Sequence, residues 1–267
     1  MRPHDHPLPD AAPLRAVSPV AAWMPPATGT LAVSLAGWGF LAWIALDMDH
    51  PVAQLMMPGD SNWSTVNIIA MLAMWSIMMA AMMLPSALPM VMAFVRLSTR
   101  GAQPVRAWIF VAAYLLVWTA VSAIATALQW ALQARDWVDP MIVSTSPMLT
   151  AVLLAIAGAY QFSPLKQVCL AHCRTPLAFL IGEWRSGVAG AFGMGVRHGL
   201  LCTGCCWALM ALLFVGGVMN LAWIAALSIV VGVEKMAPHG GRLGKVLGGA
   251  LIVAGAVKLL ALGAGGA

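Results

Sequence analysis

Long apolar stretches constrain the fold of this chain more than any other feature. Seven stretches reach or approach the roughly 20 residues that a transmembrane helix needs. Only 9% of the 267 residues are charged, whereas a soluble globular domain carries roughly 25%. The sequence therefore predicts an all-α fold, a polytopic transmembrane helix bundle with about seven spans. The predicted spans cover residues 30–46, 65–94, 107–132, 148–163, 196–217, 220–236 and 246–262.

The N-terminal segment differs in composition from the rest of the chain. Its first 26 residues contain seven prolines and no long apolar run, and they lack the compact apolar region and cleavage site of a signal peptide. We therefore predict two parts, a disordered tail over residues 1–28 and a transmembrane helical domain over residues 29–264.

Basic residues gather in alternate connections between the predicted spans. The first loop carries only Asp47, Asp49 and Asp60, whereas the second carries three arginines. Twelve of the fourteen basic residues fall on one side and one on the other, while Lys258 lies within the last span. Because cytoplasmic loops are enriched in Lys and Arg, we predict a cytoplasmic N-terminus and an external C-terminus. The basic residues also occur singly, so we expect no nucleic-acid partner.

All five cysteines fall in two short clusters on the predicted cytoplasmic side. Cys169 and Cys173 are one helical turn apart, and the second cluster follows the spacing of a single helix face. This second cluster consists of His198, Cys202, Cys205 and Cys206. Thiolate and imidazole suit copper(I) and zinc, whereas magnesium and calcium need oxygen ligands. The pattern predicts a soft-metal site, with copper first and zinc second; the alternative is that these cysteines are small packing residues.

Methionine is the second concentrated residue type, with 19 copies in the chain. Met78, Met82 and Met83 lie near the predicted cytoplasmic end of the second span, before Pro85 and Pro89. A thioether is a soft ligand that selects copper(I), but methionine is also an adaptable packing residue. We keep these three methionines as candidate transfer ligands or packing residues. The two prolines are expected to kink or end the helix.

Two other functions fit parts of the sequence. Cys202 and Cys205 form a C-x-x-C pair, which supports disulfide exchange, so a membrane thiol-disulfide oxidoreductase is the first alternative. A reducing cytosol argues against it. The second alternative is a non-catalytic assembly subunit, because Gly195 and Gly199 would let helices approach closely in lipid. Motifs for hydrolysis or phosphate binding are missing, so a role other than an enzyme is favoured.

Glu234 and Lys235 close the sixth predicted span at its cytoplasmic end. Ionisable groups inside a membrane are costly and usually functional. Near the interface, however, long charged side chains also reach toward water. We therefore expect a mutual ion pair or solvent-directed side chains here at least as much as metal ligation.

Several of these segments together resemble a bacterial family of predicted metal-binding integral membrane proteins, domain of unknown function 2182. The similarity covers about residues 65–260 and is carried by WSIMMAAMMLPSALP (75–89), YQFSPLKQVCLAHCR (160–174), GLLCTGCCWALM (199–210), Met219-Asn220 and Glu234-Lys235. The resemblance implies a multi-pass protein of the bacterial inner membrane with a metal site at the Cys-rich segments. The expected partners are the lipid bilayer, a metal ion and either a metallochaperone or another membrane protein.

Overall fold

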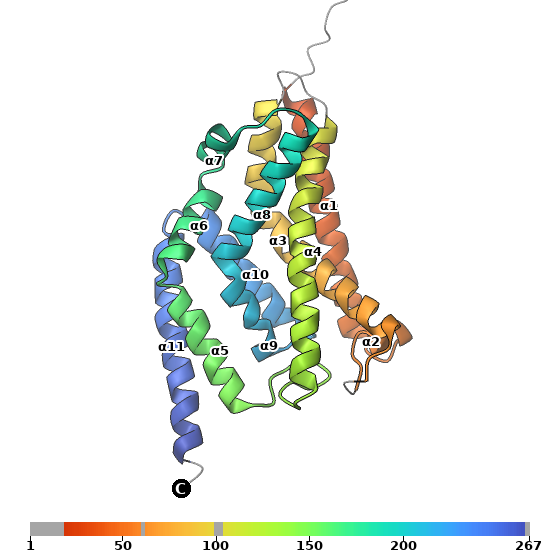
Figure 1. The fold of residues 1–267 in the computed structure, drawn as a ribbon, viewed down its shortest axis with the longest axis vertical. Coiled ribbons are helices and arrows are strands. Elements are labelled where there is room, and N and C mark those ends of the chain that lie inside the picture. The colour runs from red at the N-terminus through yellow and green to blue at the C-terminus, as the bar shows by residue number, and fades with distance from the viewer. Residues whose placement is uncertain (1–18, 60–61, 99–103, 265–267) are drawn as a thin grey trace, which may run out of the picture.

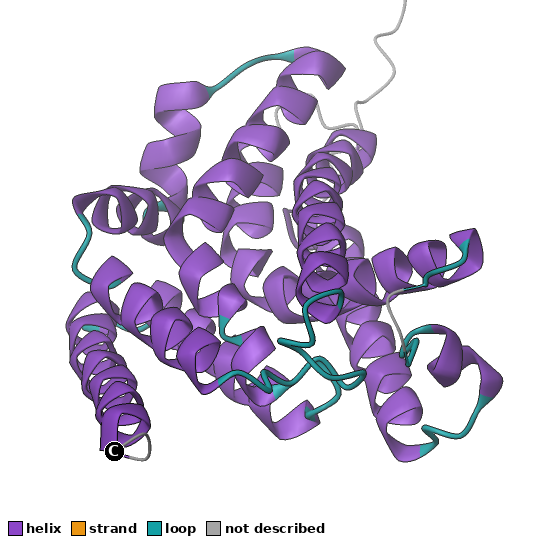
Figure 2. Cartoon of the chain, turned by 60° about the horizontal axis from the view of Figure 1, so that its bottom comes forward, coloured by secondary structure: helices purple, strands orange, loops and turns teal. Residues whose placement is uncertain are grey.

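The chain is built from helices joined by short connections. The computed structural model describes residues 19–59, 62–98 and 104–264, and these residues contain no strand longer than an isolated bridge. Figure 2 shows the same picture of helices and loops. The helices are α1 (Pro19–Leu46), α2 (Pro51–Leu55), α3 (Thr65–Ser98), α4 (Pro104–Gln133), α5 (Pro147–Tyr160), α6 (Pro164–Arg174), α7 (Pro176–Glu183), α8 (Gly187–Ala211), α9 (Leu213–Gly216), α10 (Leu221–Met236) and α11 (Gly240–Ala264).

Five helical segments in the described residues are long and apolar enough to cross a membrane. They lie in α1, α3, α4, in α8 with α9, and in α11, and a sixth candidate is formed by α5 and α6, which are bent by 64°. The all-α membrane bundle is therefore confirmed, but with five or six helices of membrane length where about seven were expected. The side of the membrane that each end faces stays a prediction.

The fourth and sixth predicted spans account for this difference. Helix α10, over the predicted span 220–236, has 16 residues, or about 24 Å at the helical rise, which is shorter than the roughly 30 Å hydrocarbon core. Helix α5, over the predicted span 148–163, ends at Tyr160 after 14 residues. Ser163 then caps the next helix by accepting from the Leu165 amide, so the chain turns before it continues as α6.

The predicted tail and the first helix overlap. Residues 1–18 of the tail lie outside the described residues, whereas residues 19–28 belong to α1. The helix begins at Pro19, and proline is well tolerated at the first helical position because its missing N–H has no partner there anyway. Thr30 also donates to the Pro26 carbonyl at 2.7 Å. Residue 28 is therefore not the start of helical structure.

The helices α1, α3, α4 and α8 run side by side along the long axis, while α5 and α11 pair at the opposite edge (Figure 1). Glycines allow the closest of these contacts. A Cβ at Gly199 would lie 2.9 Å from the Val117 side chain of α4, and one at Gly195 would meet the Phe110 carbonyl. The close approach expected from the Gly195-x-x-x-Gly199 pair is therefore found, and it is made with α4.

Helix α3 continues through Pro85 and Pro89 to Ser98, so the two prolines do not end it. A proline removes the hydrogen bond to the carbonyl four residues earlier, and for Pro85 that carbonyl belongs to Ala81. Ser34 of α1 donates its hydroxyl to the Ala81 carbonyl at 2.9 Å. Hydroxyl groups of neighbouring helices commonly satisfy such freed backbone groups in membranes, which explains why the helix persists.

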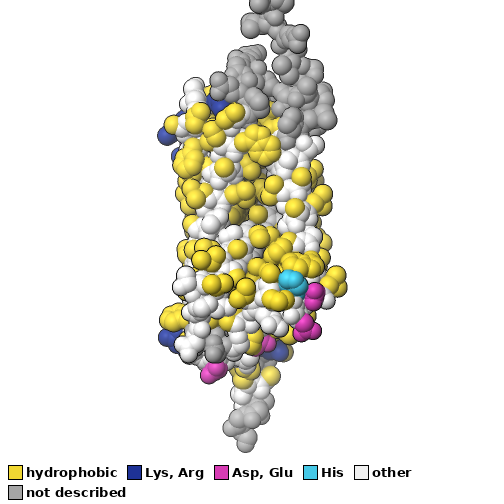
Figure 3. All heavy atoms as spheres, turned by 90° about the vertical axis from the view of Figure 1, so that its right-hand side faces the viewer, with side chains coloured by type: hydrophobic (Ala, Val, Ile, Leu, Met, Phe, Trp, Pro, Cys, Tyr) yellow, Lys and Arg dark blue, Asp and Glu magenta, His cyan; other side chains and the backbone are white. Residues whose placement is uncertain are grey.

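The outer surface matches this architecture. On the face drawn in Figure 3, hydrophobic side chains run along the whole length, and charged side chains are seen near the two ends. Most of the large exposed side chains on the long helices are apolar, such as Leu35, Ile69 and Leu260. A belt of this kind suits contact with lipid.

Candidate metal centre

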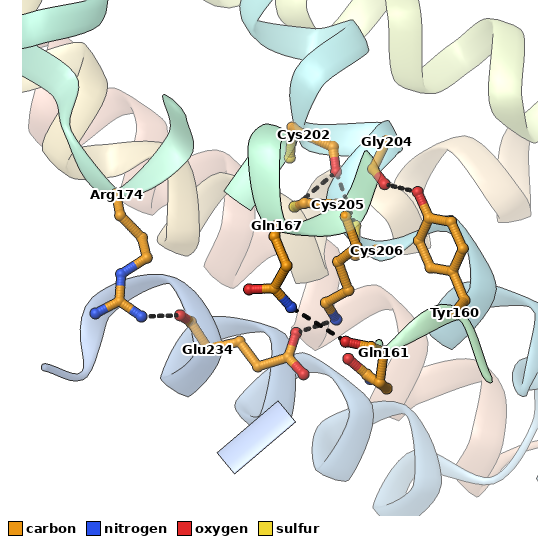
Figure 4. A network of polar contacts seen from close by, with 10 residues as sticks. Tyr160, Gln161, Gln167, Arg174, Cys202, Gly204, Cys205, Cys206 and Glu234 are labelled. Carbon is orange, nitrogen blue, oxygen red and sulfur yellow. Dashed lines mark hydrogen bonds and ion pairs between the residues drawn. The ribbon is translucent and has the colours of Figure 1, made fainter. Parts of the chain in front are cut away.

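Three of the five cysteines lie on one face of α8, each about 1% exposed. The thiols of Cys205 and Cys206 both donate to the Cys202 carbonyl, at 3.0 and 3.1 Å. Figure 4 shows the two thiols directed at this one oxygen. Residues three and four positions apart share a helix face, so the spacing of the motif gathers the three thiols without help from other elements.

The other two cysteines reach the same place from α6. A Cβ at Gly204 would lie 2.8 Å from the Cys169 sulfur, so α6 approaches α8 at a point where α8 has no side chain. One turn further along α6, the Cys173 side chain interacts with that of Cys205. Tyr160 strengthens the junction by donating its hydroxyl to the Gly204 carbonyl (Figure 4). The two cysteine segments therefore meet, as their spacing suggested.

The Cys202 sulfur has two polar neighbours from other helices. The Tyr114 hydroxyl of α4 lies 3.1 Å away, and the Lys235 ammonium of α10 donates to the sulfur at 2.9 Å. The same ammonium donates to the Ser86 hydroxyl of α3 at 3.0 Å. Cys202 is thus the point at which α3, α4, α8 and α10 are joined by polar contacts.

Glu234 and Lys235 do not form the mutual ion pair that the sequence suggested. Glu234 pairs with Lys166 of α6 at 2.6 Å, with 4% and 1% of the two side chains exposed. Lys235 is also buried, at 6% exposure, so it does not extend toward water. Consecutive residues of a helix point about 100° apart, and here one turns to α6 while the next turns to the cysteines.

Further contacts fasten the Glu234 region to α6. Arg174 donates to the backbone carbonyls of Glu234 at 3.2 Å and Ala237 at 2.7 Å, which satisfies the open C-terminal end of α10. Gln167 donates to the Gln161 carbonyl at 3.1 Å across the bend between α5 and α6 (Figure 4). The position of Cys169 and Cys173 is therefore held by polar contacts on both flanks.

His198 lies one turn before Cys202 on α8 and is 3% exposed. Its ring is stacked near those of Tyr114 and Phe110, at centroid distances of 5.4 and 6.0 Å, and Phe179 of α7 lies 5.9 Å away. Within the described residues, its buried Nδ1 atom has no hydrogen-bond partner. Leaving such an atom without a partner is costly. A metal ion coordinated by Nδ1 would remove that cost.

The candidate methionines Met78, Met82 and Met83 are all buried in α3, at most 1% exposed. The contacts that tie this part of α3 to the cluster run through its backbone. Ser228 of α10 donates to the Met82 carbonyl at 3.3 Å, and Tyr114 lies 3.4 Å from the Met83 carbonyl. Through Tyr114, the Met83 backbone carbonyl is linked to the Cys202 sulfur.

The other end of the methionine stripe has a different environment. The Met71 sulfur accepts from the Gln129 amide at 3.9 Å, and the same Gln129 side chain accepts from the Trp75 indole at 2.8 Å. Met71 is therefore part of a buried packing arrangement between α3 and α4.

The donor set fits a soft metal, although it is not preassembled. Within the described part of the chain, no group of three or more His, Cys, Asp or Glu side chains is arranged to hold a metal ion. The thiols of Cys205 and Cys206 are turned to the Cys202 carbonyl, so they must rotate to become ligands. The region holds five free thiols, of which only that of Cys173 is half-buried, and one unpartnered imidazole nitrogen, and such soft donors suit copper(I).

Sequence reasoning missed Tyr114, Ser86 and the role of Lys235. Tyr114 lies in a predicted span without any motif, and its contact with Cys202 joins residues 88 positions apart. Lys235 was recognised as unusual because it is charged near a membrane span. A charged residue at the end of a predicted membrane span was thus the available signal, but no sequence feature indicated which helix its side chain faces.

Comparison with known proteins places the chain in a family. No curated protein and no solved structure matches it. A family model described as "PpoB2: Copper chaperone" matches residues 72–258, which include all of the candidate ligands named above. This match covers more than half of the chain, and the chain therefore belongs to the PpoB2 copper chaperone family.

Proposed function

We propose that this protein is an integral membrane copper chaperone, which holds Cu(I) at the thiol cluster between α6 and α8 and passes it to a partner protein. The observation that carries the proposal is the convergence of five free thiols, four buried and Cys173 half-buried, and the unpartnered His198 nitrogen in one region. Membership of a copper chaperone family supports copper as the cargo. Zinc, the second metal expected from the donor types, has no such support.

The thiols are not equivalent as ligands. Cys202, Cys205 and Cys206 share one helix face and become neighbours through local structure alone, so we take them as the core of the site. Cys173 is next, because its side chain already interacts with Cys205, and Cys169 and His198 lie at the edges. Five thiols exceed the four ligands of a tetrahedral site, so at least one is spare or serves a second ion.

The three methionines complete the proposal. Met78, Met82 and Met83 are buried in α3, the helix whose Met83 carbonyl and Ser86 hydroxyl contact Tyr114 and Lys235, the two neighbours of Cys202. Because thioethers bind Cu(I) but bind harder ions poorly, these residues are suited to pass copper along the helix without holding it tightly.

We place the entry of copper at the surface between α6 and α7. A pocket of about 220 Å³ is lined by His172, Phe179 and Glu183 among others. Phe179 lies against the His198 ring, and His172 directly precedes Cys173. The His172 Nδ1 atom is engaged with the Val168 carbonyl at 2.8 Å, which leaves its Nε2 atom for an incoming ion. A metallochaperone or another membrane protein would dock here, on the cytoplasmic face of a bacterial inner membrane.

The oxidoreductase alternative is disfavoured by burial. Thiol-disulfide exchange requires an accessible attacking thiolate, whereas Cys202 and Cys205 are each 1% exposed. Both sulfurs also face partners inside the protein, namely Lys235 and Tyr114 for Cys202 and Cys173 for Cys205.

Copper binding by the full-length protein tests the proposal. The purified protein in detergent, kept reduced and free of oxygen, is titrated with Cu(I) against a chromophoric chelator. We expect the wild type to bind copper tightly and the Cys202→Ser/Cys206→Ser variant to lose most of that binding, while Met71→Leu binds like the wild type. Equal copper binding by a variant lacking all five cysteines would contradict the proposal and return these residues to packing.

A further inference from the structure

We propose that Lys235 is the charge-balancing and positioning residue of the copper site, whose ammonium stabilises Cys202 as an anionic ligand in a copper–dithiolate complex. This inference rests on the proposed function, because it assumes that the thiols hold copper. It assigns a role to a residue of α10, which lies outside both cysteine segments.

The ammonium of Lys235 is buried against the metal-binding donors. Its Nζ atom lies 2.9 Å from the Cys202 sulfur and 3.0 Å from the Ser86 hydroxyl, and the residue is 6% exposed. The lysine thus extends from α10 between α3 and α8. Both of these partners are uncharged when the thiol is protonated.

The other buried charges near the cluster are already compensated. Lys166 and Glu234 form a buried ion pair at 2.6 Å, whereas the second ion pair of the described residues, Arg197 with Glu183, lies nearer the surface, with 56% and 27% of the two side chains exposed. Neither pair includes Lys235. Removing a charge from water is costly unless an opposite charge accompanies it, so the region around Lys235 holds one excess positive charge.

The chemistry of Cu(I) binding supplies the missing negative charge. A Cu(I) ion bound by two cysteines displaces two thiol protons, which leave with the solvent, and the resulting complex carries one negative charge. With Cys202 as one of the two thiolates, the complex and the Lys235 ammonium together are neutral. Their attraction is strong in an apolar interior, so it favours the copper-bound state.

The position of Ser86 makes this arrangement possible. Ser86 directly follows Pro85 on α3 and donates its hydroxyl hydrogen to the Met83 carbonyl at 2.9 Å. Its oxygen is therefore free to accept from Lys235, which fixes the ammonium beside Cys202. The proline–serine step on α3 thus helps to position the lysine.

A double-mutant cycle with Cu(I) competition titrations of the full-length protein tests the proposal. Lys235→Met removes the charge and keeps most of the volume, and we expect Cu(I) affinity to fall by about 10–100-fold, as for other residues that support metal ligands. Lys235→Arg should restore most of the affinity, and Lys258→Met on α11 is the matched control that should leave it unchanged. In a Cys202→Ser background, where four thiols remain, Lys235→Met should change the affinity by less than about 2-fold, because contacting residues are coupled.

A purely structural role of Lys235 predicts a different result. Lys235→Met would then weaken binding equally in both backgrounds, and Lys235→Arg would not rescue it; either finding overturns the proposal, as does wild-type affinity in Lys235→Met. Thermal unfolding of each variant identifies any variant that fails to fold. If Cys202→Ser itself binds copper like the wild type, Cys202 is not a ligand and the proposal for Lys235 is overturned. The proposed function fails only if a variant lacking all five cysteines binds copper like the wild type, so the two failures are distinguishable.

Discussion

Two neighbouring residues of α10 lead to two different buried polar regions. Glu234 joins Lys166 in an ion pair that is complete by itself, whereas Lys235 faces a thiol and a hydroxyl. The first region pairs a cation with an anion, whereas the second places a cation beside groups that carry no charge while the thiol is protonated. From this comparison we infer that the Lys166–Glu234 pair has a structural role, whereas Lys235 marks the place where a negatively charged copper complex would bind.

The largest expected effect is a difference in unfolding free energy between variants of Lys166 and of Lys235. Lys166→Met leaves the Glu234 carboxylate buried without its partner, and breaking a buried pair in this way typically costs about 3–5 kcal/mol of unfolding free energy. Lys235→Met removes a buried cation that has no carboxylate partner in the described residues, so we expect a much smaller loss.

Denaturant unfolding in detergent measures both variants. The double variant Lys166→Met/Glu234→Gln should recover a large part of the loss, because it removes both charges. Equal destabilisation by Lys166→Met and Lys235→Met would abolish the distinction between the two regions.

The next effect concerns the contact that brings the α6 cysteines to α8. Gly204→Ala would place a methyl group 2.8 Å from the Cys169 sulfur, and overpacking of this kind typically costs about 1–3 kcal/mol. We expect lower stability together with weaker Cu(I) binding, because Cys169 and Cys173 would move away from Cys205. Gly193→Ala on the same helix meets no atom within 4 Å and is the control. A wild-type Cu(I) affinity in Gly204→Ala would show that the α6 thiols are dispensable.

The two ends of the methionine stripe should respond differently to the same substitution. Met82→Leu, beside the cluster, is expected to slow copper transfer to an acceptor chelator by less than about 10-fold, since a thioether is a weak soft ligand. Met71→Leu, which loses only the contact with Gln129, should transfer copper at the wild-type rate. Stopped-flow transfer measurements compare them, and identical rates would leave both methionines as packing residues.

The smallest expected effect on Cu(I) affinity concerns Ser86, in the region around Lys235. Ser86→Ala removes one acceptor of the Lys235 ammonium, and a single hydrogen bond contributes about 0.5–1.5 kcal/mol. We expect Cu(I) affinity to fall by no more than about 10-fold, less than for Lys235→Met. A larger loss than that of Lys235→Met in the same titration would mean that Ser86 acts by some other route.

Much of the fold was predictable because hydrophobic length and helix spacing are local properties. The second and third predicted spans, 65–94 and 107–132, lie within α3 and α4 as the structure has them. The sixth predicted span, 220–236, matches α10 (Leu221–Met236) almost residue for residue, but it was counted as a span although it is shorter than the roughly 20 residues that a transmembrane helix needs. Apolar composition also could not reveal that Ser163 starts a new helix and bends the chain.

The candidate site was likewise predictable only where it depends on local helix geometry. The grouping of Cys202, Cys205 and Cys206 follows from helix periodicity and was visible in the sequence. The contacts of Tyr114 and Lys235 with Cys202 join residues 88 and 33 positions apart, so they depend on how four helices pack together. A mutual ion pair or solvent-directed side chains were expected for Glu234 and Lys235, but both are buried and helix geometry directs them to different neighbours.

X-ray absorption at the copper edge of the full-length, Cu(I)-loaded protein tests the central claim most directly. If the thiol cluster holds the copper, the first coordination shell of Cu(I) in the wild type should be dominated by sulfur. The same measurement on Cys202→Ser/Cys206→Ser should show a clear loss of sulfur ligands. A shell of nitrogen and oxygen in the wild type, or a spectrum unchanged by these substitutions, would contradict copper binding by the cysteines of α8.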